Sequence, residues 1–149
     1  MISLDSNILY YAVDPDAGAK HIFAADLVAR LRPGSSFLTQ QAIGEFLNVC
    51  RRRARLATRD AIEQVEAWAT FFEIVPTMPD QLLDAARLAE RRKKQFWDMV
   101  ILTVAADGGA KVLISEDIGD GEVIEGVRIL NPFDPANRQA LEAILTPSS

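Results

Sequence analysis

The chain has 149 residues, a length typical of one compact domain, and we expect a single domain over residues 1–149. Hydrophobic residues make up 49% of the sequence and charged residues 25%, which excludes an intrinsically disordered protein. Cys50 is the only cysteine and His21 the only histidine, which excludes a disulfide framework and a His- or Cys-clustered metal site. The net charge of −5 excludes bulk attraction to nucleic acid, so an anionic substrate would need a local basic patch or a bound cation.

No segment has the pattern of a membrane span or a targeting sequence. The longest apolar run, residues 99–106, is far shorter than the ~20 residues that a spanning helix needs. The first five residues contain an acid and no basic residue, unlike a secretory signal. We therefore expect a cytoplasmic protein with no membrane partner.

Short apolar runs alternate with stretches of helical periodicity along the chain. In chain order they predict a strand at 2–4, a helix from residue 8, a helix over 17–31, a strand at 36–38, a helix capped by Thr39, a helix over 58–72, a strand at 73–75, a helix from 79 into the basic residues 91–94, a helix over 98–106, strands at 112–114 and 127–130, and a helix over 135–145. This alternation, with no hairpin signal, favours a parallel sheet covered on both faces. The expected fold class is α/β, as a three-layer α/β/α domain with a central parallel sheet.

Acidic side chains follow two of the predicted strands. Asp5 comes directly after the strand at 2–4, and Glu116 and Asp117 follow the strand at 112–114. In open α/β sheets, ligands bind outside the carboxyl ends of the strands. These acids are therefore placed to share one crevice.

Two more acids lie on predicted helices. Asp98 is in the first turn of the helix over 98–106, where an acid is also common for capping reasons alone. A step of 100° per residue puts Glu45 about 40° from Val49 and about 60° from Ala42, at the edge of an apolar stripe. A rim glutamate with a solvated head is the structural alternative there.

Taken together, these acids predict a concave acidic cluster. Like charges in a cleft raise each other's pKa values, so such a cluster needs a cation to stabilise it. Carboxylate oxygens suit a hard cation, which makes Mg²⁺ or Mn²⁺ the expected cofactor. Such an ion activates water and stabilises a leaving oxygen, and it allows an acidic protein to accept a phosphodiester.

At these residues the sequence resembles the PIN-domain ribonucleases, in particular the VapC-type toxins of bacterial toxin–antitoxin pairs. The matching segments are residues 4–10, 44–46, 96–101 and 113–117, in the same order and spacing, with similarity extending through residue 133. The resemblance implies a PIN-like domain and a metal-dependent endoribonuclease. It also implies a homodimer, an antitoxin whose C-terminal peptide occupies the groove, and a structured RNA substrate such as tRNA.

The resemblance also implies roles for individual residues. The four family acids correspond to Asp5, Glu45, Asp98 and Asp117. We expect Asp5, Asp98 and Asp117 to hold the metal and Glu45 to orient a second metal or its water. Ser115 corresponds to the Ser or Thr that precedes the fourth acid, and Asn7 to a polar residue that supports the site. Glu116 and Asp120 remain alternatives for the fourth acid.

Basic residues follow Glu45 on the same predicted helix, namely Arg51, Arg52, Arg53 and Arg55. Arg52 lies within about 20° of the direction of Glu45, so its guanidinium is a candidate phosphate ligand. Basic residues also favour helix C-termini, which explains their position without any substrate.

Three other functions remain open on the sequence. A phosphatase would use Asp5 as nucleophile, but its motif has a second aspartate where this chain has Asn7. A phospho-receiver domain needs paired acids after the first strand, where this chain has Ser6 and Asn7. The third alternative is a catalytically inactive PIN-like module that binds RNA or protein.

Overall fold

The structure is a computed structural model that describes residues 1–53 and 56–146. Its strands are β1 (Ile2–Leu4), β2 (Phe37–Thr39), β3 (Glu73–Val75), β4 (Val112–Ile114), β5 (Val123–Ile124) and β6 (Val127–Leu130). Its α-helices are α1 (Ser6–Val13), α2 (Ala19–Arg30), α3 (Gln40–Arg53), α4 (Thr58–Phe71), α5 (Pro79–Arg92), α6 (Phe96–Asp107) and α7 (Arg138–Leu145), with 3₁₀ turns at Pro15–Ala17 and Pro135–Asn137. Each predicted strand and helix is present.

The sheet is mostly parallel. β1, β4 and β6 pair in parallel in the order β1-β4-β6, and β2 pairs in parallel with β3. A single parallel bridge between Ile2 and Ser36 connects β1 to the β2-β3 pair. Ile2 N also donates a hydrogen bond of 2.9 Å to Ser35 O at this junction. The prediction of a central parallel sheet is therefore confirmed for these strands.

The expectation of a sheet without hairpins is wrong at one edge. β5 pairs antiparallel with β6 through a two-residue loop. The loop residues Glu125 and Gly126 have φ angles of 51° and 77°, so both are left-handed, as in the type I′ turns that match the twist of a hairpin. Because β5 has only two residues, the sequence offers too short a run for strand periodicity.

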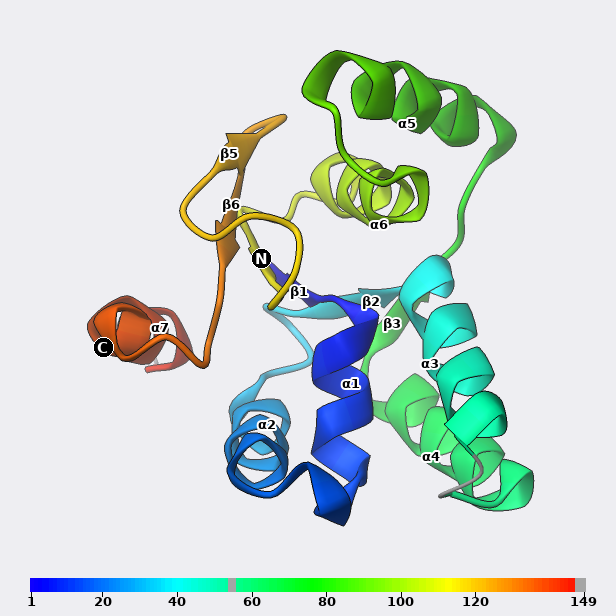
Figure 1. Cartoon of the computed structure of the whole chain (residues 1–149), viewed down its shortest axis with the longest axis vertical. Helices are drawn as coiled ribbons and strands as arrows, with labels where there is room; N and C mark the ends of the chain where they lie inside the picture. Colours follow the sequence, from blue (N-terminus) through cyan, green and yellow to red (C-terminus); the bar gives the residue numbers. More distant parts are fainter. Residues whose placement is uncertain (54–55, 147–149) are drawn as a thin grey trace.

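The helices cover the sheet from both sides. α5 and α6 lie on one side of the strands and α1 to α4 on the other, as Figure 1 shows. α6 is buried from Met99 to Ala105, in agreement with a helix that is apolar nearly all round. The fold is thus a three-layer α/β/α arrangement, and the first turn of α6 reaches the edge of the sheet where the acids lie.

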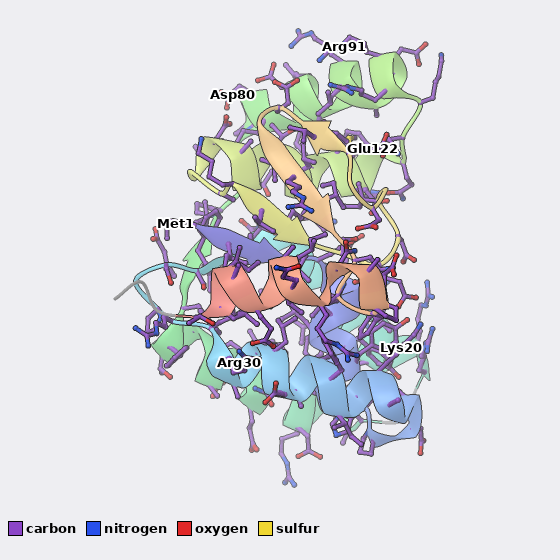
Figure 2. All side chains as sticks on the ribbon, turned by 90° about the vertical axis from the view of Figure 1, so that its left-hand side faces the viewer. Met1, Lys20, Arg30, Asp80, Arg91 and Glu122 are labelled. Carbon is purple, nitrogen blue, oxygen red and sulfur yellow. The ribbon has the colours of Figure 1, made fainter. Side chains whose placement is uncertain are left out.

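α7 is fastened to α2 by an arginine. Arg30 Nη1 and Nη2 donate to the two carboxylate oxygens of Glu142 over 2.8 and 2.6 Å. Figure 2 shows Arg30 near one end of α2, below α7, and Lys20 near the other end of α2. None of the helices in the described residues is long and apolar enough to cross a membrane.

Candidate active site

Asp5 lies at the carboxyl end of β1 and is only 3% exposed. Its backbone N donates to Ile114 O of the neighbouring β4, which fixes the residue at the sheet edge. Oδ1 accepts a 2.7 Å bond from Ser6 N, which caps α1, and Oδ2 accepts a 2.6 Å bond from Ser115 Oγ. A buried carboxylate with both oxygens hydrogen-bonded is poorly exposed as a nucleophile, which argues against the phosphatase alternative.

Ser115 and Asn7 hold the acids at the ends of β1 and β4 in place. The Ser115 hydroxyl donates to Asp5 and accepts a 3.2 Å bond from Asp117 N. Asn7 Nδ2 donates to Asp117 Oδ2 over 3.0 Å. Two parallel strands and the first turn of α1 thus place Asp5 and Asp117 beside each other.

Asp98 enters from the opposite layer. It is the third residue of α6, and its backbone N donates to the Gln95 side chain, which caps the helix. Burial, followed by the negative charges of Asp5 and Asp117, raises the pKa of Asp98 to about 6, against an opposing effect of Lys94. Asp98 is therefore a first-turn acid that faces the other two acids.

Glu45 is half-buried on α3, as its place at the edge of the apolar stripe predicts. Burial, with added repulsion from Asp5 and Asp98, raises its pKa to about 7. Its Oε2 atom is buried and has no hydrogen-bond partner within residues 1–53 and 56–146. Burial likewise raises the pKa of Asp5; hydrogen bonds from Ser115 and Ser6 oppose this effect, and the charge of Asp117 adds to it.

The four acids therefore come from four elements and act on one another electrostatically. Among the described residues, no three His, Cys, Asp or Glu side chains are arranged as a ready metal-holding group. The available donors are carboxylate, amide and hydroxyl oxygens, and one buried carboxylate oxygen of Glu45 has no partner in the part of the chain that the structure describes. This donor set and its excess of negative charge fit a hard divalent cation.

Glu116 and Asp120, the two alternatives for the fourth acid, form their hydrogen bonds and ion pairs with residues outside the acidic cluster. Glu116 forms an ion pair of 2.8 Å with Lys20 Nζ, and its Oε1 accepts a 3.3 Å bond from Tyr11 OH. Asp120 Oδ1 accepts bonds from Asn131 N and Asn137 Nδ2. Asp117 is the acid of this loop that the structure joins to Asn7 and Ser115.

The basic residues of α3 differ in position. Arg52 and Arg53 are both exposed, and Arg53 lines a cavity together with Asn7 and Asp117. Arg55 lies outside the described residues. The sequence does offer a signal for Arg53, because it lies four residues after Val49 of the apolar stripe and so one turn along the same face.

Lys94 is the last residue of the basic run at residues 91–94, and its contacts are ones that the sequence did not predict. Its Nζ donates to Ile118 O over 2.8 Å and pairs with Glu122 Oε2 over 2.5 Å. It therefore joins the segment before α6 to the loop that follows Asp117. The sequence offers no signal for this contact, because it depends on how the two segments meet.

Solved structures share this fold. VapC20 of Mycobacterium tuberculosis, described as a sarcin-ricin loop cleaving toxin, is 20% identical, with 82% of this chain and 92% of the toxin covered and a TM-score of 0.64. A toxin–antitoxin complex from Klebsiella pneumoniae is 20% identical, with 89% and 98% covered and a TM-score of 0.65. VapBC2 of Rickettsia felis, bound to a DNA fragment from its promoter, is 16% identical, with 87% and 97% covered and a TM-score of 0.61.

No curated protein matches the chain in sequence. Residues 2–119 match the family model described as the PIN domain. This match includes β1, the helix that carries Glu45, the first turn of α6 and the loop with Asp117, so it spans every acid of the cluster. The chain belongs to the PIN domain family.

Proposed function

We propose that the protein is a metal-dependent endoribonuclease and the toxin of a type II toxin–antitoxin pair. The observation that carries this proposal is the meeting of Asp5, Glu45, Asp98 and Asp117 from four elements at one edge of the sheet. A neighbour of the same fold is described as a toxin that cleaves the sarcin-ricin loop, and others are toxin–antitoxin complexes. These relatives support both the RNA substrate and the antitoxin partner.

Asp5, Asp98 and Asp117 are the residues that would hold Mg²⁺ or Mn²⁺. When bound, the ion would supply an activated water and stabilise the leaving oxygen of the phosphodiester. Glu45, with a pKa of about 7, is able to hold or release a proton near neutral pH and so to orient or deprotonate the attacking water. Asp5 remains fixed by its two hydrogen bonds while substrate binds.

Neutral polar groups support the acids. Ser115 keeps Asp5 and Asp117 in register through one hydroxyl, and Asn7 orients Asp117 through its amide nitrogen. Asn7 Oδ1 is buried and has no hydrogen-bond partner among the described residues. We assign Asn7 and Ser115 to the support of substrate binding.

The proposed setting is a cytoplasmic homodimer of single-domain chains, residues 1–149, with no membrane partner. The proposed target is a structured RNA such as tRNA, and the proposed antitoxin covers the acidic cluster. The family membership and the toxin–antitoxin neighbours support this setting.

The test is cleavage of structured RNA by the purified protein with Mg²⁺, with Mn²⁺ and with EDTA. We expect cleavage only with a divalent ion, and a loss of at least about 100-fold for Asp98→Asn, in the range expected when a charged catalytic group is removed. Asp120→Asn is the matched control, because Asp120 binds Asn131 and Asn137 rather than the cluster. Equal cleavage in EDTA, or full activity of Asp98→Asn, would show that this mechanism is wrong.

A further inference from the structure

A cavity of about 220 Å³ opens beside the acidic cluster. Ser6, Asn7, Tyr10 and Tyr11 of α1 form one wall, Arg53 at the end of α3 forms another, and Asp117 connects the cavity to the acids. α1 and α3 pack side by side, as Figure 1 shows. A ligand in this cavity would therefore lie next to the proposed point of cleavage.

Arg53 is held at the cavity wall by an aromatic ring. Its guanidinium carbon lies 5.0 Å from the centre of the Tyr10 ring. Tyr10 is 5% exposed and belongs to the hydrophobic core, so the ring is a fixed support for the cation. Arg52 and Arg53 are both exposed, but Arg53 is the one that lines the cavity and lies over the Tyr10 ring, so it is better positioned for binding.

An anionic RNA strand needs a compensating positive charge at this place, because the surrounding protein is negatively charged. The protein has a net charge of −5, and four carboxyl groups face the proposed cleavage point. Arg53 is the only basic side chain among the described residues that line the cavity. A guanidinium forms paired hydrogen bonds with a phosphate, and the hydroxyl and amide groups of Ser6 and Asn7 suit the sugar beside it.

We infer that this cavity binds the phosphodiester next to the one that is cleaved, with Arg53 as the phosphate ligand. The inference rests on the proposed ribonuclease function and deepens it, because it assigns the direction from which a single RNA strand enters the acidic cluster. Tyr11 also lines the cavity, and its side chain is the aromatic group available there for contact with the attached base. Arg53 takes the role that sequence reasoning gave to Arg52.

The experiment compares Arg53→Ala with Arg52→Ala, two neighbouring arginines on one helix. Binding of a short fluorescein-labelled single-stranded RNA is measured by anisotropy over a range of salt concentrations. All variants carry Asp98→Asn so that the RNA is not consumed. We expect Arg53→Ala to raise Kd about tenfold, the effect of losing hydrogen bonds to a charged group, and to reduce the salt slope by about 0.7, the value for one phosphate contact on a single strand.

Arg52→Ala should leave the salt slope unchanged. Arg53→Lys keeps a cation over Tyr10 but cannot form the paired bonds, so we expect it to retain the salt slope while Kd rises. Thermal unfolding of each variant separates loss of binding from loss of fold. Equal salt slopes and equal Kd values for the two alanine variants would overturn the subsite. It would also be overturned if Arg53→Ala weakened binding of polyglutamate, an anionic polypeptide, but did not change RNA binding.

Cleavage by the chain without Asp98→Asn is measured in parallel, which separates the two proposals. RNA binding that depends on Arg53, in a protein that cleaves no RNA with Mg²⁺, would overturn the hydrolytic function and leave the subsite standing. Mg²⁺-dependent cleavage that Arg53→Ala and Arg52→Ala affect equally would overturn the subsite alone.

Discussion

Ser115 shows how one side chain sets the geometry of two acids. It is fully buried, and its hydroxyl both donates to Asp5 and accepts from the backbone of Asp117. An alanine there would leave a buried carboxylate oxygen and a backbone N–H without this partner. The hydroxyl two residues before Asp117 is therefore a requirement of the site's hydrogen bonding.

We expect Ser115→Ala to lower the free energy of unfolding by about 1–3 kcal/mol, the cost of leaving a buried polar group unsatisfied. Because the Ser115 hydrogen bond lowers the pKa of Asp5, its loss should raise that pKa further and weaken Mg²⁺ binding. Urea unfolding and isothermal titration with Mg²⁺ measure the two effects.

Ser3→Ala is the matched control for that experiment. Ser3 is also fully buried, and its hydroxyl donates to Phe37 O over 2.8 Å, away from the acids. The Ser3→Ala variant should lose about as much stability as Ser115→Ala does, but it should keep the Mg²⁺ affinity of the parent chain. If both variants bind Mg²⁺ as the parent chain does, Ser115 has no role in the metal site.

At the scale of elements, the β5–β6 hairpin closes one edge of the sheet. Its loop residues Glu125 and Gly126 both have left-handed backbone angles, a combination that suits glycine and asparagine. The ion pair between Arg91 and Glu125 is exposed and measures 3.3 Å, so it contributes at most about 1 kcal/mol. The backbone conformation therefore decides which residues this turn accepts.

Gly126→Val should lower the free energy of unfolding by about 1–2 kcal/mol, because a β-branched residue is strained at a φ of 77°. Glu125→Asn keeps a residue that tolerates the left-handed region and should leave stability nearly unchanged. Chemical denaturation of both variants provides the measurement. A Gly126→Val protein as stable as its parent would mean that the turn has another conformation.

Across the whole molecule, the acids come together at a cost in stability. Glu45 and Asp98 have folded-state pKa values of about 7 and about 6, above those of the unfolded chain. Groups with raised folded pKa values stabilise the protein below their unfolded pKa, and this contribution is lost as pH rises through the folded pKa. The metal-free protein should therefore be more stable near pH 5 than near pH 8.

The expected Tm of the metal-free protein falls between pH 5 and pH 8, by about 2–4 °C for each kcal/mol lost. A Glu45→Gln/Asp98→Asn variant should have a flatter profile, because neither substituted group titrates. Mg²⁺ at about 100 times its Kd should restore about 2.7 kcal/mol to the parent chain at pH 8 and little to the variant. Calorimetry measures these profiles, and parallel curves for the two proteins would contradict the prediction.

The sequence was sufficient for most of the fold because its signals are local. The apolar run at residues 2–4 and the all-apolar helix from Asp98 onward predict β1 and α6, and both are present and buried. The hairpin escaped prediction because a strand of two residues has no periodicity. Its turn could have been suspected from the glycine at position 126, but Glu125 is an unusual partner for it.

For the candidate site, sequence determined the types of the acids and their places on the elements. Asp5 and Asp117 follow paired strands, so their proximity is a consequence of the sheet register between Leu4 and Ile114. The sequence did not determine whether Arg52 or Arg53 is the better candidate for a phosphate ligand. That choice depends on the contact between Arg53 and the Tyr10 ring of α1. A helical wheel of α3 cannot show this contact, because it includes only residues of α3.

By itself, the sequence determined the alternation of strands and helices and which residues follow each strand. Its single His and single Cys also excluded a metal site built from clusters of these residues. These properties follow from periodicity, composition and chain order. Only the tertiary structure decided that Glu116 pairs with Lys20 and that Lys94 donates a hydrogen bond to Ile118 O. It also decided that Arg53 lines the same cavity as Asp117. Such contacts join residues far apart in the chain, and their geometry is set by how whole layers pack.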